Sequence, residues 1–212
     1  MLFNAIFSYS QILIDDGLII INKQIGITPD YVIQGNSWDH RVLTYWFSNG
    51  TNDITGNDER IVKRSAMDIW QNQTDMRFLE VGDSVDADII IMWATGDHGD
   101  GYPFDGIGGT LAHGFYPPPN GDYAGDVHFD DAETWTTATR SNSDQPIDLL
   151  TIAAHEPGHS LGLAHSSVSS ALMYAYYSGS HRYLDQDDIN GIRSIYGNSG
   201  TYNFISGPSP VC

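Results

Sequence analysis

The stretch HEPGHSLGLAH, residues 155–165, decides how the rest of this chain is interpreted. It fits the spacing His-Glu-x-x-His-x-x-Gly-x-x-His. His155 and His159 stand four residues apart, so on a helix they lie one turn apart on the same face and both imidazoles can point at one ion. Gly162 can adopt the positive φ that ends a helix and turns the chain, which would bring His165 to the same ion. The sequence therefore predicts three imidazole ligands for one metal.

Three imidazole ligands predict a zinc site of the catalytic kind. Three protein ligands leave the fourth tetrahedral position open for water, whereas structural zinc sites are closed. Zinc lowers the pKa of that water to about 7 and polarises a carbonyl. Glu156, beside the first ligand, is then the expected general base. A lone histidine is more often an ordinary core or surface residue, but five fixed positions together recur by chance on the order of once in ten million starts.

Composition restricts the class of protein. The 212 residues are enough for one core-bearing domain with short extensions. Nine Lys and Arg against 27 Asp and Glu give a net charge of -18, which disfavours nucleic acid and anionic membranes as partners and suits divalent cations. No uninterrupted apolar run approaches the roughly 20 residues of a membrane span. Because the single cysteine, Cys212, is the last residue, neither an internal disulfide nor a cysteine-ligated zinc is expected.

The segments around the motif predict an α/β domain. Three stretches have the β-branched and aromatic composition of strands, namely residues 42–47, 76–81 and 87–94. Helices are expected over residues 148–161, with Asp148 as N-cap, and over 185–196, ending at Gly197. Between them, residues 95–142 are rich in Gly, Asp, Pro and Asn, and a loop of that length in a compact domain is normally functional. We expect bound metal to order it.

One further helix is expected over residues 57–73, with Thr55 or Asn57 as its cap. Six of its residues fall on one stripe at helical spacing, and this stripe is expected to pack on the core: Ile61, Val62, Ser65, Ala66, Ile69 and Trp70.

The histidine motif, with Met173 eight residues after its last histidine, resembles the metzincins, in which a methionine turn lies beneath the zinc. Ser166 follows the third histidine where astacins and adamalysins carry an acidic residue, and serralysin-type repeats are absent. The segments HGDGYPFDGIGGTLAH (98–113) and DVHFDDAETW (126–135) resemble matrixin segments almost position by position. The resemblance to matrixins, the matrix metalloproteinases and their bacterial relatives, covers roughly residues 31–197. It implies a zincin fold, a twisted mixed five-stranded sheet with three helices.

The matrixin resemblance implies further metal sites. A structural zinc with three imidazoles, one carboxylate and no open position would use His98, Asp100, His113 and His128. That assignment leaves His40 and His181 as surface residues. Hard oxygen donors from a Gly-rich loop suit calcium, and the implied ligands are the side chains of Asp105, Asp130 and Glu133 with the carbonyls of Gly106, Gly108 and Thr110. A second calcium on Asp88 and Asp126 stays open, because two extra residues separate His113 from His128 relative to the family pattern.

The resemblance also implies how substrate is held. Leu111 and Ala112 match the edge strand along which matrixins pair an extended peptide. Tyr174, Ala175 and Tyr176 match the wall of the pocket for the side chain after the scissile bond, which is usually bulky and apolar; core packing is an equal interpretation for Tyr174. Asp187 and Asp188 match an acidic pair that anchors the new N-terminus or neighbouring backbone in matrixins, and a structural role is expected for them.

Together these features predict a secreted, monomeric zinc metalloendopeptidase that acts on protein or peptide substrates. Pro157 departs from the family pattern. Inside the helix it removes the hydrogen bond to the Ala153 carbonyl at a cost of roughly 3 kcal/mol, and a kink could move His155 relative to His159. The alternative is therefore a catalytically impaired homologue that binds peptide and metal without turnover. A purely structural calcium- and zinc-binding adhesion domain would have little reason to carry Glu156.

The ends of the chain are expected to lie outside the catalytic domain of residues 31–197. Residues 1–30 are interpreted as a prosegment or N-terminal extension. They contain no cysteine to act as a temporary zinc ligand, so Asp30, Asp15 and Asp16 are the candidates for an acidic latch. Residues 198–212 form a tail whose ISGPSPVC resembles the opening of immunoglobulin-like modules in secreted bacterial proteins, which suggests a following module.

Overall fold

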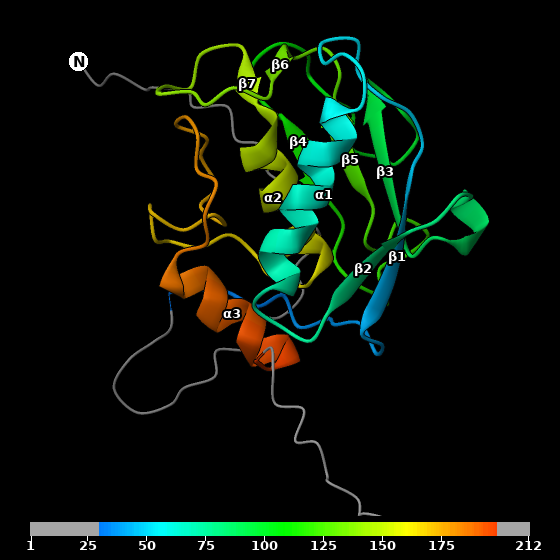
Figure 1. The fold of residues 1–212 in the computed structure, drawn as a ribbon, viewed down its shortest axis with the longest axis vertical. Coiled ribbons are helices and arrows are strands. Elements are labelled where there is room, and N and C mark those ends of the chain that lie inside the picture. The colour runs from blue at the N-terminus through cyan, green and yellow to red at the C-terminus, as the bar shows by residue number, and fades with distance from the viewer. Residues whose placement is uncertain (1–29, 199–212) are drawn as a thin grey trace, which may run out of the picture.

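The computed structural model describes residues 30–198, so the expected prosegment and tail lie outside the described residues apart from Asp30, which is exposed, and Asn198. Eleven elements follow one another in this range (Figure 1). They are β1 (Val42–Phe47), α1 (Asp58–Gln71), β2 (Arg77–Glu80), the 3-10 helix η1 (Ser84–Asp86), β3 (Ile89–Ala94), β4 (Ala112–Gly114), β5 (Val127–Asp130), β6 (Trp135–Thr136), β7 (Ile147–Asp148), α2 (Leu149–Ser160) and α3 (Gln186–Tyr196).

The main sheet has five strands in the order β2-β1-β3-β5-β4. β1 pairs in parallel with β2 and β3, and β3 pairs in parallel with β5. β4 is antiparallel to β5 and forms one edge. The expected mixed five-stranded sheet with three α-helices is confirmed. β4, β5 and β6 all arise from the segment 95–142, where composition alone indicated only a loop.

Alternation along the strands decides which face of the sheet meets the helices. In β1 the residues Leu43, Tyr45 and Phe47 are buried, and β3 alternates in the same way. α1 and α2 lie side by side across this face (Figure 1). The indole Nε1 of Trp70 on α1 donates to the carbonyl of Ala154 on α2 at 2.8 Å. The helix that carries the histidine motif is therefore fixed between the sheet and α1.

α1 buries a different stripe from the expected one. Its buried residues are Glu59, Lys63, Ala66, Met67 and Trp70, whereas Ile61 is 54% exposed. The prediction was right for Ala66 and Trp70 and wrong for Ile61 and Ser65, which are exposed, because apolar periodicity cannot detect a face that buries an ion pair. Asn57 occupies the N-cap position, but its side chain makes no capping hydrogen bond.

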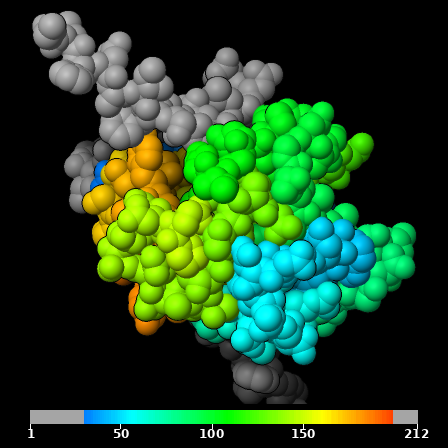
Figure 2. All heavy atoms as spheres, turned by 90° about the horizontal axis from the view of Figure 1, so that it is seen from above, coloured from blue at the N-terminus to red at the C-terminus, as the bar shows by residue number. Residues whose placement is uncertain are grey.

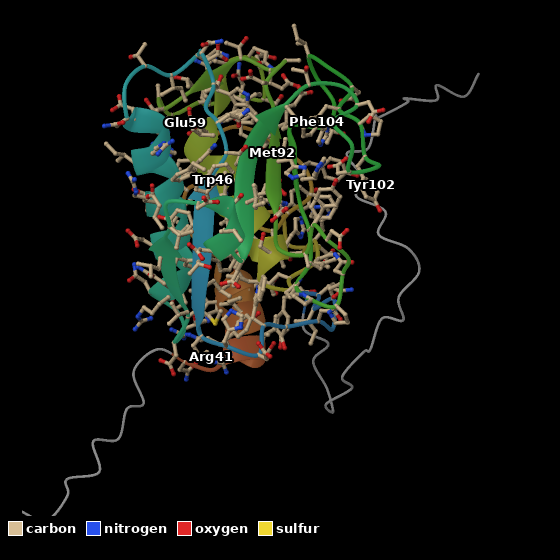
Figure 3. All side chains as sticks on the ribbon, turned by 90° about the vertical axis from the view of Figure 1, so that its right-hand side faces the viewer. Arg41, Trp46, Glu59, Met92, Tyr102 and Phe104 are labelled. Carbon is tan, nitrogen blue, oxygen red and sulfur yellow. The ribbon has the colours of Figure 1, made fainter. Side chains whose placement is uncertain are left out.

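The buried ion pair joins α1 to the sheet. The Lys63 side chain is 2% exposed, with Nζ 3.4 Å from Glu59 Oε1 and 4.2 Å from the ring centroid of Trp93. Glu59, labelled in Figure 3, also accepts hydrogen bonds from Trp93 Nε1 at 2.9 Å and from the Thr51 backbone N–H at 3.0 Å. Burial lowers the pKa of Lys63 to about 7. The Glu59 carboxylate is thus the main partner of the desolvated Lys63 ammonium group.

Replacing Glu59 tests this linkage. Glu59→Ala leaves Lys63 buried without its counter-charge, so the free energy of unfolding is expected to fall by about 3–5 kcal/mol in chemical denaturation. The matched control is Glu80→Ala, which removes the partner of Arg64 from a more exposed ion pair and should cost about 0–1 kcal/mol. Equal losses for the two variants would contradict the assigned role of the buried pair.

Candidate metal centre and substrate pocket

α2 and the turn after it present the three histidines of the motif. His155 and His159 lie on α2, which continues through Pro157 as far as Ser160. Gly162 has φ +98°, as its place in the motif predicted. A Cβ at this position would lie 2.5 Å from the Asn36 carbonyl oxygen, so the turn requires glycine for space as well as for conformation.

The turn brings His165 back to the two helical histidines. One ring nitrogen from each of the three residues lies within 4.8 Å of the others, and the Nε2 atoms of His159 and His165 are 3.2 Å apart. Despite Pro157, the rings of His155 and His159 keep a centroid separation of 4.9 Å. The three residues form one candidate metal site.

Backbone carbonyls fix the orientation of the helical imidazoles. His155 Nδ1 donates to the Leu172 carbonyl and His159 Nδ1 to the Leu163 carbonyl, each at 2.7 Å. With Nδ1 protonated, the Nε2 lone pair of each ring is free for a cation. Burial lowers the pKa of His155 to about 3 and that of His159 well below its ordinary value. Both rings are therefore neutral at physiological pH, as ligation requires.

Glu156 is a buried carboxyl group beside this cluster. The residue Glu156 is 5% exposed, and its Oε2 atom is buried with no hydrogen-bond partner. Burial raises the pKa of Glu156 to about 8, against an opposing effect of the Gly114 backbone N–H. An unpartnered carboxylate oxygen is costly unless a ligand, a water or an ion completes it. It lines the same pocket as the three histidines.

A turn held by α3 supports the site from below. Met173 is 2% exposed, and a Cβ added at Gly158 would overlap its sulfur, so the methionine packs directly beneath α2. The Asp188 carboxylate accepts the backbone N–H groups of Leu172 at 2.7 Å and Met173 at 3.0 Å. Asp187 accepts from Ser166 Oγ at 2.6 Å. Asp188 thus anchors neighbouring backbone as predicted, whereas Asp187 holds the side chain of Ser166.

A second cluster forms beside β4 and β5. Asp100 Oδ2 lies 2.7 Å from the Nε2 atoms of His98 and His113 and 2.8 Å from Nδ1 of His128. Burial lowers the pKa of His113 to about 4. Phe104 stacks on the rings of His98 and His113 at 4.7 Å; Figure 3 labels it on the loop beside the sheet. Three imidazoles and a carboxylate that converge in this way fit a closed tetrahedral zinc site.

A third set of candidate ligands lies in the loop that precedes β4 and the turn after β5. Glu133 Oε1 accepts from the Gly108 N–H at 2.6 Å, and Asp105 Oδ1 from the Thr110 N–H at 3.0 Å. Asp130 Oδ2 is buried without a partner. Burial, together with the neighbouring carboxylates, raises the pKa values of Asp130 and Glu133. Buried carboxylate oxygens that lack a full set of partners fit calcium. Within residues 30–198, however, only the two histidine clusters bring their ligand atoms within 4.8 Å of one another.

The carboxylates predicted for a second calcium have other partners. Asp88 Oδ2 accepts from the backbone N–H and the hydroxyl of Thr44, both at 2.8 Å, and lies 3.4 Å from His40 Nε2. Asp126 Oδ1 accepts from the Ile90 N–H at 2.7 Å, and burial raises the pKa of Asp126 to about 7. Nothing in these contacts brings the two carboxylates together, and the second calcium stays a prediction.

A pocket of about 290 Å³ opens beside the histidine triad and Glu156. It contains all four predicted cleft residues, Leu111, Ala112, Ala175 and Tyr176, and also Tyr174. Several lining residues were missed, because they lie outside the motifs: Ile147 on β7, Thr151 and Ile152 on α2, and Ser143, Gln145, Tyr177 and His181 in loops. His181 was expected on the surface, as His40 was. His40 is exposed, but His181 is only partly exposed and lines the pocket.

A mixed sheet backed by a two-histidine helix, a glycine turn and a methionine turn defines a zincin-class catalytic domain. The sequence pattern of the peptidase family Matrixin matches residues 37–197, and the chain belongs to this family. Family membership implies zinc as the metal of the site.

Three relatives illustrate the similarity. Karilysin of Tannerella forsythia is 46% identical over 211 residues, which cover 98% of this chain and 42% of the relative. The hatching enzyme of Paracentrotus lividus is 47% identical over 175 residues, 81% of this chain and 28% of the relative. The macrophage metalloelastase of Rattus norvegicus is 44% identical over 188 residues, which cover 85% of this chain and 39% of the relative. The chain thus spans less than half the length of these relatives. No helix among the described residues is long and apolar enough to cross a membrane.

Asp188→Asn tests the support beneath the triad. Both carboxylate oxygens of Asp188 accept a hydrogen bond from a backbone N–H, so in either orientation the NH₂ group of the substituted amide would face one of these donors. The turn that positions the Leu172 carbonyl should therefore shift. We expect zinc affinity, measured by competition with a chromophoric chelator, to fall about 10–100-fold. Asp187→Asn is the control, with a smaller change. Unaltered affinity in Asp188→Asn would contradict this positioning role.

Proposed function

We propose that this chain is a zinc-dependent metalloendopeptidase that hydrolyses extended protein or peptide substrates. The observation that carries the proposal is the combination of three neutral imidazoles around one point with an unpartnered, buried Glu156 carboxyl oxygen in the same pocket. A purely structural metal site has no use for such a carboxylate. The proposal assigns His155, His159 and His165 to the catalytic zinc.

The chemistry divides between the ion and the protein. When bound, zinc would acidify a water molecule and polarise the scissile carbonyl. Glu156 would take the proton from the attacking water and deliver it to the leaving amine. It can do so because its carboxyl group lines the same pocket as the three histidines. Burial raises the pKa of Glu156 to about 8, and a cation bound beside it would lower that pKa and so favour the ionised form that a base needs. His155 and His159, whose Nδ1 atoms are held by backbone carbonyls, would bind the ion through their Nε2 atoms.

Substrate binding is proposed along β4. This strand is an edge of the sheet, so an extended peptide can add to it beside Leu111 and Ala112. The side chain after the scissile bond would enter the pocket between Ala175, Tyr176 and Ile152. The apolar part of this lining supports a preference for a bulky apolar residue.

The impaired-homologue alternative depended on Pro157. The unbroken span of α2 and the close approach of the His155 and His159 rings speak against a displaced ligand. These observations favour turnover over binding alone.

The remaining assignments complete the proposal. A structural zinc would be held by His98, Asp100, His113 and His128, and a calcium by the Asp105, Asp130 and Glu133 loop with the carbonyls of Gly106, Gly108 and Thr110. We propose a secreted monomer with residues 31–197 as its catalytic domain, flanked by the prosegment and the tail described above. The proposal of secretion rests on the similarity of this chain to a hatching enzyme and to a macrophage metalloelastase.

Glu156→Ala tests the proposed base. Cleavage of a quenched fluorescent peptide with Leu after the scissile bond should fall about 10²–10⁴-fold, while two zinc ions per chain remain bound. Cleavage by the unaltered chain should stop when a hydroxamate chelator is added. Unchanged turnover in Glu156→Ala would refute the assigned mechanism. Absence of turnover in the unaltered, zinc-loaded chain, after residues 1–30 are removed, would favour the impaired homologue.

Calcium removal tests the loop assignment. Chelation of calcium with zinc kept saturated should lower the thermal midpoint, because a ligand at 100 times its Kd adds about 2.7 kcal/mol to the folded state. Asp130→Asn should abolish this calcium dependence, since it alters the carboxylate whose Oδ2 has no protein partner. The control Asp131→Asn should keep it. A midpoint that is insensitive to calcium in all three chains would exclude the site.

A further inference from the structure

One side of the pocket is formed by residues 174–184, called here the wall loop. Tyr174, Ala175, Tyr176, Tyr177 and His181 of this loop line the pocket. The loop contains no helix and no strand, apart from one isolated bridge at Tyr174. A segment without a backbone ladder must be held by other contacts if the pocket is to keep one shape.

One buried residue, Asp148, supplies several of those contacts. Asp148, with no exposed side-chain area, accepts from Ser180 Oγ at 2.6 Å. It also accepts from Arg182 Nε and Nη2, both at 2.7 Å, one on each carboxylate oxygen. Its backbone N–H donates to Tyr177 Oη at 3.1 Å. Three residues of the wall loop thus converge on one position.

Asp148 belongs to the metal-binding helix as well. It is the N-cap of α2, where it accepts from the Leu150 N–H at 3.2 Å and from Thr151 Oγ1 at 2.8 Å. Thr151 Oγ1 in turn accepts the His181 N–H at 2.8 Å. His155 lies two turns further along the same helix. The carboxylate therefore fixes the wall loop relative to the histidine triad.

The guanidinium of Arg182 extends the connection to a third segment. Its Nη2 also donates to the Thr137 carbonyl at 2.8 Å. Nearby, Ser180 N–H donates to the Arg140 carbonyl at 2.8 Å, and a Cβ at Gly179 would lie 3.0 Å from that carbonyl oxygen. In Figure 2 the orange segment around residues 170–185 borders the yellow-green segment around residues 135–150.

We propose that Asp148 and Arg182 form a positioning pair that sets the width of the substrate pocket and thereby its specificity. Neither residue lines the pocket, so the pair acts through the wall loop. Two parallel charge-assisted hydrogen bonds in a buried site fix geometry as well as energy. A wall held at one distance can discriminate between side chains of different size, whereas a mobile wall cannot. This inference rests on the proposed peptidase function.

Arg182→Met is the test variant. It keeps the apolar stem and removes the planar fork, while Asp148 retains Ser180, Thr151 and the Leu150 N–H as donors, so the helix cap persists. We expect kcat/KM for a peptide with Leu after the scissile bond to fall about tenfold, through KM, which corresponds to about 1.4 kcal/mol. A matched peptide with Ala there should change less, so the Leu/Ala preference falls. Arg182→Lys, which keeps the charge, serves if Arg182→Met does not fold.

The control and a second readout separate this role from general stability. Arg64→Met removes an ion pair to Glu80 at 2.5 Å, on α1 and outside the pocket lining, and should leave the Leu/Ala preference unchanged. Backbone amide exchange of residues 174–184 should accelerate in the Arg182 variants at unchanged zinc content. An unchanged preference with unchanged exchange would overturn the proposal, as would loss of zinc. If the unaltered chain cleaves no peptide, the proposed function fails, and the exchange rates alone decide the positioning role.

Discussion

Three imidazoles can share one ion only if their outer nitrogens converge, and two backbone hydrogen bonds impose that condition here. His155 and His159 each donate through Nδ1 to a carbonyl, and those carbonyls belong to Leu172 and Leu163. Much of the C-terminal half serves to hold these acceptors in place. Gly162 turns the chain so that Leu163 lies next to α2, and Asp188 accepts the backbone N–H groups of Leu172 and Met173. The metal geometry is thus a consequence of backbone positions that lie outside the ligands themselves.

Several of the many acidic residues of this chain are buried, and each of these carboxylates has a defined partner or lies at a proposed metal site. Glu59 meets a buried lysine, Asp148 meets Arg182 and a helix N-terminus, and Asp100 meets three imidazoles. Asp130 and Glu156 each keep one oxygen without a partner, and both lie where a cation is proposed. A buried carboxylate left incomplete is expensive, so these two atoms are the strongest physical argument for ions that the protein is built to bind.

The catalytic motif was readable from the sequence because its spacing is local. Residues i and i+4 on a helix, followed by a glycine turn, determine a ligand set over eleven positions, and Gly162 adopts the positive φ this requires. The strands β1, β2 and β3 and the three α-helices were predictable for the same reason, whereas β4, β5 and β6 lie in a segment whose composition indicated only a loop. The burial of Lys63 was not predictable, because a charged residue on a core-facing stripe contradicts the hydrophobic pattern. It is explained by Glu59 and by aromatic rings from three strands, β1, β3 and β5. Tyr174, Ala175 and Tyr176 of the wall loop were predicted as pocket residues, but Tyr177 and His181 were missed, because the course of the loop depends on contacts with residues some 30 to 45 positions away.

Anomalous diffraction at the zinc absorption edge, from crystals of the purified chain, tests the central claim most directly. The account predicts two zinc peaks, one bounded by His155, His159 and His165 beside Glu156, and one bounded by His98, Asp100, His113 and His128. The first should have an open position facing the pocket. A crystal of zinc-saturated protein with no peak at the histidine triad, or with a fourth protein ligand closing that site, would contradict the account.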